Sequence, residues 1–168
     1  MATQAMNRSS TAAFSGGSAS TFRQLSERER MSIHRLIVRD IETEWSEQVM
    51  AKLNELVALP TGWDGYSGSG VTFEIAHFSA NLLQSIFVPD APIPSLVPGS
   101  DGSMQIEWHA HGFDIELDVI AVNQVMCLRR DVASGVELEL FLETDFKEVR
   151  SWMIELADRA SHAVSAAA

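Results

Sequence analysis

The sequence has little of what characterises a secreted, membrane-spanning or nucleic-acid-binding protein. Cys127 is the one cysteine and cannot form an intramolecular disulfide, which fits a reducing compartment. No apolar run approaches the roughly 18–20 residues that a membrane-spanning helix needs. The chain starts without the basic and then apolar segments of a secretory signal. We therefore expect a cytoplasmic protein that makes no membrane contact.

Basic residues are missing from a long central segment. Residues 61–120 contain no lysine or arginine, and the whole chain has a formal net charge of −11. A surface of this sign repels nucleic-acid phosphates and anionic lipid headgroups, and it attracts basic proteins or cations. We therefore expect no nucleic-acid binding by the folded domain, although acidity can also serve solubility alone. The eight acidic residues of this segment are Asp64, Glu74, Asp90, Asp101, Glu107, Asp114, Glu116 and Asp118.

The composition supports one folded domain. Apolar residues make up 46% of the 168 residues, which is enough to form a core. Residues 1–22 are rich in serine, alanine, threonine and glycine and are predicted to be a disordered tail. The single domain is predicted over residues 23–162, with a frayed C-terminus over residues 163–168.

A long amphipathic helix is predicted over residues 26–58. Ser26 and Glu29 form a capping-box pattern, Pro60 lies just beyond the end, and apolar residues recur at helical spacing between them. An unbroken helix of this length would extend about 50 Å, which exceeds a compact domain of this size. Either the helix breaks near residue 40, or its first half projects and pairs with a second copy to form a homodimer.

Two further helices are predicted. Thr72 is placed to cap a helix that ends near Phe87, and apolar residues follow it at helical spacing. Asp145 with Glu148 resembles the capping box of a C-terminal helix. That helix is expected to bury Phe146, Val149, Met153, Leu156 and Ala160.

Between these helices the pattern is that of β-strands. Residues 104–109 and 113–119 alternate apolar and polar side chains with period two. Further strands are expected at about 125–130 and 136–142, and a short strand at 95–97 is expected to join the edge. The fold class is therefore α+β: an antiparallel meander of four to five strands with helices packed on one face, in the order α-α-β-β-β-β-α.

The register of the first hairpin is predicted from its alternation. A turn at Ala110 and His111 would place Trp108 opposite Phe113 and would keep every apolar side chain on the core face. A slip of one residue would reverse the two faces. The polar residues of neighbouring strands are therefore expected to share the outer face of the sheet.

Carboxylates dominate this predicted outer face. Like charges directly opposite each other on neighbouring strands destabilise a sheet by about 0.2–1 kcal/mol per pair, so their accumulation suggests a positively charged occupant. A basic protein partner and a divalent cation are both open interpretations. So is a solvated face partly neutralised by Arg129 and Arg130. The carboxylates concerned are Glu107, Asp114, Glu116, Asp118, Glu137 and Glu139.

A His-x-His motif lies at the predicted hairpin tip. His109 and His111, with Asp114 or Glu116, have the residue types of a zinc or iron site in a small metal-dependent enzyme. A hairpin tip holds ligands loosely and no third ligand is specified, so ordinary surface histidines account for the motif more simply. We predict no cofactor.

The most distinctive local string is Trp63-Asp64-Gly65-Tyr66. Glycines around it permit positive φ, Asp64 can close an Asx turn, and the two aromatic residues can anchor a partner. The alternative interpretation is structural: Trp63 plugs the core while Asp64 and Gly65 turn the chain between helices.

Two motifs give a resemblance to a known group. The segment L-P-x-G-W-D-G-Y occupies residues 59–66, and D-G-x-x-x-x-E-W occupies residues 101–108. With the two in this order, the chain resembles a group of small uncharacterised bacterial proteins over about residues 52–120. It departs from the group in its long N-terminal helix and in Ser103, where a second glycine is common. The resemblance implies a bacterial or phage origin and assigns no activity.

The sequence favours a non-catalytic protein-binding module of antitoxin, immunity or adaptor type that neutralises or positions a basic partner. It has no phosphate-binding loop and no nucleophile elbow, and an exposed sheet is a poor place to raise a carboxyl pKa. The predicted partner-binding residues are the six carboxylates of the outer face together with Trp63, Asp64 and Tyr66. The alternatives are the metal-dependent enzyme and a structural or assembly module that uses the N-terminal helix.

Overall fold

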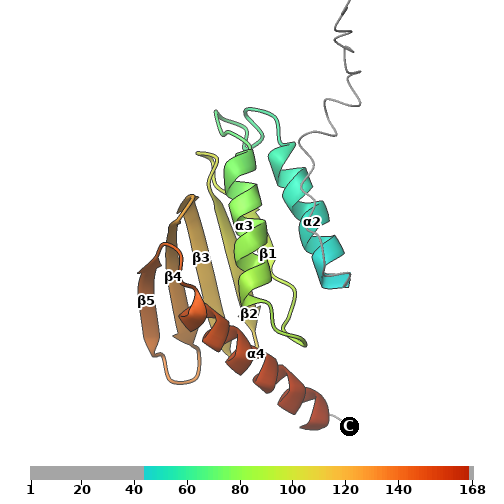
Figure 1. Cartoon of the computed structure of the whole chain (residues 1–168), viewed down its shortest axis with the longest axis vertical. Helices are drawn as coiled ribbons and strands as arrows, with labels where there is room; N and C mark the ends of the chain where they lie inside the picture. The colour runs from blue at the N-terminus through green and yellow to red at the C-terminus, as the bar shows by residue number, and fades with distance from the viewer. Residues whose placement is uncertain (1–43, 167–168) are drawn as a thin grey trace, which may run out of the picture. The chain divides into compact units, whose positions relative to one another are not determined.

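The computed structural model describes residues 44–166, which belong to one compact unit, His34–Ala168. The predicted tail over residues 1–22, the first part of the long helix and its proposed role in a homodimer lie outside the described residues. Three helices and five strands follow one another along the described chain (Figure 1). They are α2 (Glu44–Val57), α3 (Phe73–Ile86), β1 (Ser95–Pro98), β2 (Met104–Ala110), β3 (Phe113–Ala121), β4 (Gln124–Asp131), β5 (Glu137–Leu142) and α4 (Lys147–Ala166).

The strands form one five-stranded sheet in the order β1-β2-β3-β4-β5, and every neighbouring pair is antiparallel. This arrangement confirms the predicted α+β fold with a meander sheet. It also confirms that the short segment near residue 95 joins the edge, where Ser95 pairs with Glu107. No helix among residues 44–166 is long and apolar enough to cross a membrane.

The register of the first hairpin differs from the predicted one. The turn falls at His111 and Gly112, both with positive φ (51° and 79°), so Ala110 pairs with Phe113 and Trp108 pairs with Ile115. A two-residue turn with positive φ at both positions matches the right-handed twist of the flanking strands. The pairing moves by two positions relative to the prediction, and every side chain therefore stays on its predicted face.

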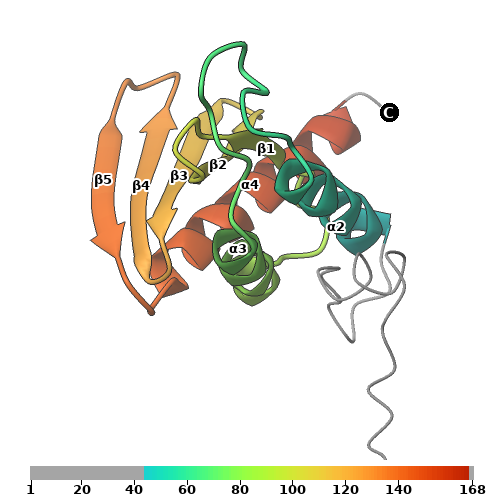
Figure 2. The same cartoon turned by 90° about the horizontal axis from the view of Figure 1, so that it is seen from above.

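The core lies between one face of the sheet and the three helices (Figure 2). The helix-side residues are buried from Met104 to Trp108 in β2, from Phe113 to Val119 in β3, and at Val125 and Cys127 in β4, as the period-two pattern predicts. Trp152 on α4 is also fully buried, and its indole N–H donates to Glu148 at 3.3 Å. The sequence analysis did not include Trp152 in the predicted core.

The helix ends follow their capping residues. The Thr72 hydroxyl accepts a hydrogen bond from the Ile75 amide at 3.3 Å, which confirms the predicted N-cap of α3. Asp145 accepts from the Lys147 amide at 3.1 Å at the start of α4. Helix α4 continues to Ala166, beyond residue 163 where the sequence predicted fraying.

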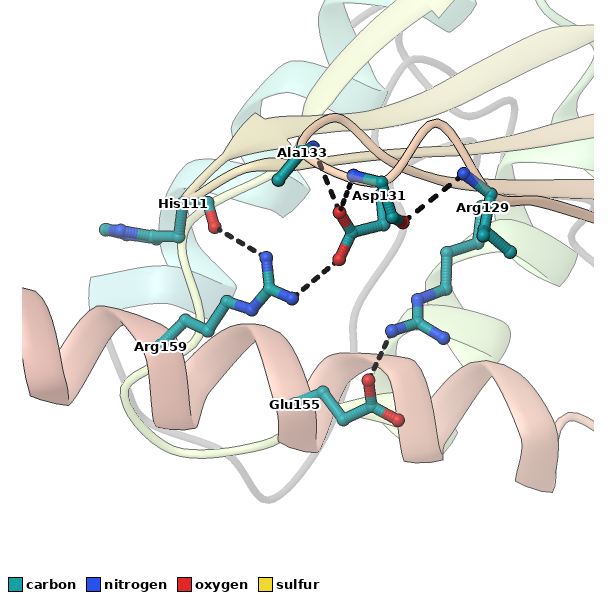
Figure 3. Close-up of polar contacts among 8 residues, drawn as sticks. His111, Arg129, Asp131, Ala133, Glu155 and Arg159 are labelled. Carbon is teal, nitrogen blue, oxygen red and sulfur yellow. Dashed lines mark hydrogen bonds and ion pairs between the residues drawn. The ribbon is translucent and has the colours of Figure 1, made fainter.

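Two arginines tie α4 to the sheet at one end of β4 (Figure 3). Arg159 lies 2.7 Å from the carboxylate of Asp131, and Arg129 pairs with Glu155. The guanidinium carbons of Arg129 and Arg159 also lie 4.4 and 3.7 Å from the centre of the buried Phe113 ring. These cation–π contacts and ion pairs hold α4 against the helix-covered face of the sheet.

Candidate protein-binding face of the sheet

The face of the sheet away from the helices is called the open face here. Its side chains are the alternate residues of each strand that the core does not take. Cross-strand pairing places them in three rows that run across the sheet. The open face carries Ser95, Val97, Gln105, Glu107, His109, Asp114, Glu116, Asp118, Met126, Leu128, Arg130, Glu137, Glu139 and Phe141.

All six carboxylates predicted to share the outer face lie on the open face. Glu107 is directly opposite Glu116 on the neighbouring strand. Glu139 lies in the same row and is separated from Glu116 by Leu128. The geometric premise of the acidic-face hypothesis is therefore met, and the like-charge pair at its centre costs stability.

One end of the open face is partly neutralised. His109 Nδ1 lies 2.9 Å from Asp114, and His109 Nε2 lies 3.4 Å from Glu107. The hydrogen bond with Asp114 is the main cause that raises the pKa of His109 above its usual value. At the same end, Arg130 Nε lies 3.6 Å from Glu137.

One open interpretation of the sequence had Arg129 partly neutralising this face as well, and this was wrong. Successive residues of a strand point to opposite faces. Arg130 therefore reaches the open face, whereas Arg129 turns to the helix side, where it pairs with Glu155 and lies over Phe113. The open face keeps more of its negative charge than the prediction allowed.

The opposite end of the open face has a shallow hollow of about 210 Å³. Asp118, Gln105 and Val97 line it from three strands, and the turn between β1 and β2 closes one side. Partial burial, and then repulsion from Glu107, raise the pKa of Asp118. A cation placed in the hollow would relieve both effects, because it would offset the desolvation and the repulsion of the ionised carboxylate.

The open face also carries apolar side chains that the sequence analysis did not include in the candidate site. Met126 and Leu128 stand on β4 in the rows of Asp118 and Glu116, and Phe141 on β5 continues the Met126 row with 53% of its surface exposed. The signal in the sequence is that β4 has apolar residues on both faces over Val125–Leu128. We call Met126, Leu128 and Phe141 the apolar stripe.

The Trp63–Tyr66 string lies in the loop between α2 and α3. The Asp64 carboxylate accepts hydrogen bonds from the amides of Tyr66 (2.9 Å) and Gly68 (3.0 Å), which confirms the predicted Asx turn. These amides lower the pKa of Asp64. The Trp63 indole N–H donates to the carbonyl of Ser69 at 2.9 Å. The side chains of Asp64 and Trp63 therefore stabilise the loop through hydrogen bonds to its backbone. Trp63 is only partly buried, so it does not fill the core as the structural interpretation expected.

Tyr66 is the exposed member of this string, with 89% of its surface open to solvent. The loop that carries it contacts the turn between β1 and β2, where the Ser69 amide donates to Ser100 at 2.9 Å and Ser69 forms a bridge with Asp101. The loop that contains residues 59–66 is thus joined to the β1–β2 turn, where the segment 101–108 begins. Among residues 44–166, the hydrogen bonds and ion pairs of the open-face carboxylates do not include Tyr66.

The two histidines of the alternative metal-site interpretation are not brought together. His109 lies on the open face with its two carboxylates, whereas His111 occupies the hairpin turn and its carbonyl accepts from Arg159 at 3.4 Å. Within the described part of the chain, no group of three or more histidine, cysteine or acidic side chains is arranged to hold a metal ion. Cys127 is fully buried on the helix side, and burial raises the pKa of its thiol to about 12.

Comparisons with protein-family models, with curated proteins and with solved structures gave no match for this chain. The geometry and charge of the open face are therefore the features from which a function can be proposed.

Proposed function

We propose that this protein is a non-catalytic binding module that neutralises or positions a basic protein partner on the open face of its sheet. The observation that carries the proposal is that six carboxylates share this face with an apolar stripe. The proposal includes a cytoplasmic location and an antitoxin-, immunity- or adaptor-like role.

Charge supports a basic partner in particular. Glu116, Asp118 and Glu139 form no ion pair with an arginine, lysine or histidine within residues 44–166. Their mutual repulsion is a cost that a positively charged partner would remove on binding. Such a partner also approaches faster, because the negative potential steers its diffusion.

The apolar stripe supports a protein partner over a simple cation. Protein interfaces combine exposed aromatic and methionine side chains at the centre with polar side chains around them. Met126 and Phe141 neighbour one another in one row that Asp118 continues, and the carboxylates of Glu116 and Glu139 stand in the next row. The matching surface would alternate lysine or arginine with apolar residues.

A calorimetric titration tests this function with a defined probe. The probe is a synthetic peptide of alternating lysine and leucine, and the same peptide with glutamate in place of lysine is the negative control. The open-face variant carries Glu116→Gln, Asp118→Asn and Glu139→Gln. The off-face variant carries Glu47→Gln, Asp90→Asn and Asp158→Asn, which remove three exposed charges from α2, α4 and the α3–β1 loop.

The full chain is expected to bind the lysine–leucine peptide, and its affinity should fall steeply with added salt. The open-face variant should bind about tenfold more weakly than the off-face variant, although both have the same net charge. Equal weakening by both variants would show attraction to overall charge alone, and the proposal would then be wrong. A peptide of alternating lysine and serine should bind more weakly than the lysine–leucine peptide, because it cannot cover the apolar stripe.

A further inference from the structure

Strand β5 forms an exposed edge of the sheet. It pairs with β4 on one side, and no strand among residues 44–166 pairs with its other side. Figure 2 shows β4 and β5 extending beyond the helices. Leu138 turns toward the helix side, yet 40% of its surface is exposed. The outer edge of β5 therefore presents both unpaired backbone and apolar side chains.

The unpaired backbone groups can be assigned to particular residues. The β4–β5 hairpin is closed by a hydrogen bond from the Asp131 amide to the Val136 carbonyl at 2.9 Å. Hydrogen-bonded and non-hydrogen-bonded pairs alternate along an antiparallel ladder. It follows that the amides and carbonyls of Glu137, Glu139 and Phe141 point outward, away from β4.

This edge has few of the features that usually prevent pairing. Natural edge strands are short, or carry charged side chains (lysine above all), proline or a bulge. The charged side chains of β5 are Glu137 and Glu139. The other edge strand, β1, has four residues and ends in Pro98. Strand β5 has six residues, contains neither lysine nor proline, and pairs with β4 in a continuous register.

We infer that β5 pairs antiparallel with β5 of a second copy of this chain, giving one continuous ten-stranded sheet. The inference goes beyond the proposed partner binding and does not depend on it. A two-fold axis perpendicular to the sheet keeps the helices of both copies on one side and their open faces on the other.

The sequence of β5 selects a register because it is self-complementary about Leu140. Centring the axis on Leu140 pairs Leu138 with Leu142 of the second copy on the helix side. It pairs Glu139 with Phe141 of the second copy on the open face. Glu137 then lies opposite Glu143, which follows β5, so acidic side chains face each other only beyond the two ends of the Leu138–Leu142 ladder. Centring the axis on Glu139 would place Glu139 opposite itself, and centring it on Leu138 would place Glu137 opposite Glu139. Like charges disfavour both alternatives.

The interface is small, so the dimer is expected to be weak. A ladder of this length buries on the order of 1,000 Å² or less, which is at the low end for specific interfaces. Each copy has a formal net charge of −11, and added salt will screen the repulsion between copies. Dimerisation should therefore strengthen with salt, whereas binding of a basic partner should weaken.

Sedimentation equilibrium of the full chain over about a hundredfold range of concentration tests the inference. Phe141→Glu places two acidic side chains opposite each other in the predicted register and should leave the protein monomeric. Phe141→Lys places lysine opposite Glu139 of the second copy and should preserve the dimer. Ile120→Glu and Ile120→Lys, at an exposed position on β3, make the same charge changes away from β5 and should leave dimerisation close to wild type.

Two results would overturn the inference. The first is a wild-type protein that stays monomeric at every concentration, which would mean that β5 is covered from within its own chain or not at all. The second is a dimer that persists in Phe141→Glu, which would place the interface elsewhere, such as the predicted N-terminal helix. Phe141 is half-exposed in the wild type, so its replacement is expected to leave the fold intact. Circular dichroism of each variant checks this.

Discussion

The open-face variant should be more stable than the wild-type protein, because its carboxylates repel one another. Glu116 stands directly opposite Glu107, and burial together with the smaller effect of repulsion from Glu107 raises the pKa of Asp118. Replacing Glu116 and Asp118 by their amides removes both repulsions and keeps the size of each side chain. The Gln105 amide, which donates to Glu116 at 3.2 Å, still finds an oxygen acceptor in glutamine.

The expected gain in free energy of unfolding comes from two like-charge pairs. Glu116 is directly opposite Glu107, and Asp118 is diagonal to Glu107. At about 0.2–1 kcal/mol for each like-charge pair, the open-face variant should gain about 0.5–1.5 kcal/mol in free energy of unfolding. For a protein of this size that is a rise in melting temperature of about 2–5 °C. The gain should shrink at high salt, which screens the repulsion in the wild type.

Thermal unfolding followed by circular dichroism at low and high salt measures this effect. The off-face variant removes the same number of charges and should change the free energy of unfolding by less than about 0.5 kcal/mol. A melting temperature of the open-face variant equal to or below that of the off-face variant would refute the reasoning, since it would mean that these carboxylates do not repel. The combination of higher stability and weaker peptide binding is typical of a surface kept for function.

Three further predictions concern pH, the α4 contacts and the loop. Protonated His109 offsets negative charge on the open face, and its pKa is raised above the usual 6.5. Affinity for the lysine–leucine peptide should therefore rise with pH as His109 loses its proton, and His109→Gln should flatten that pH dependence. Arg159→Ala should lower the free energy of unfolding by about 1–2 kcal/mol in urea titrations, because it removes an ion pair and a cation–π contact. Hydrogen bonds from the Ser134 amide and then from Arg159 lower the pKa of Asp131 to about 2, so the contribution of Asp131 to stability is present above pH 3.8 and is lost as the pH falls toward 2. Arg159→Ala should reduce this loss in part. In Gly68→Ala a Cβ would lie 2.7 Å from the carboxyl carbon of Asp64, so hydrogen exchange of the loop amides should accelerate, whereas Ser67→Ala should not change it.

Alternation was enough to predict the two faces of the sheet. Residues two apart in β2 and β3 must point to the same side, whatever the turn between them. The prediction placed the turn at Ala110 and His111, one residue early, and still assigned Glu107 and Glu116 to the same face as the structure does. The register itself depends on which two residues take positive φ, and Gly112 is the residue that does so at the least cost.

The candidate site was predicted only in its charged part. The apolar stripe was not predicted. Met126 and Leu128 lie in a strand that is apolar on both faces, so no alternation shows which residues face outward. Arg129 was misassigned because two neighbouring arginines give no indication of which one faces outward. Their faces are set by the pairing of Leu117 with Cys127, a tertiary contact that the pattern of β4 alone does not contain.

The turn at Asp64 could be predicted from the sequence, but the position of its loop against the sheet could not. The spacing of Asp64 and the glycines predicts an Asx turn. The position of the loop against the β1–β2 turn depends on the Ser69 amide reaching Ser100, a contact between segments about thirty residues apart in the sequence. Short-range patterns do not determine such contacts.

The central claim is that the open-face carboxylates form a binding surface for a basic partner. Chemical-shift mapping of the full-length protein during titration with the lysine–leucine peptide tests it most directly. The perturbed amides are expected to cluster on the open-face residues of β2, β3, β4 and β5, and these perturbations should disappear in the open-face variant and persist in the off-face variant. Perturbations confined to the helices, or equal losses in both variants, would contradict it.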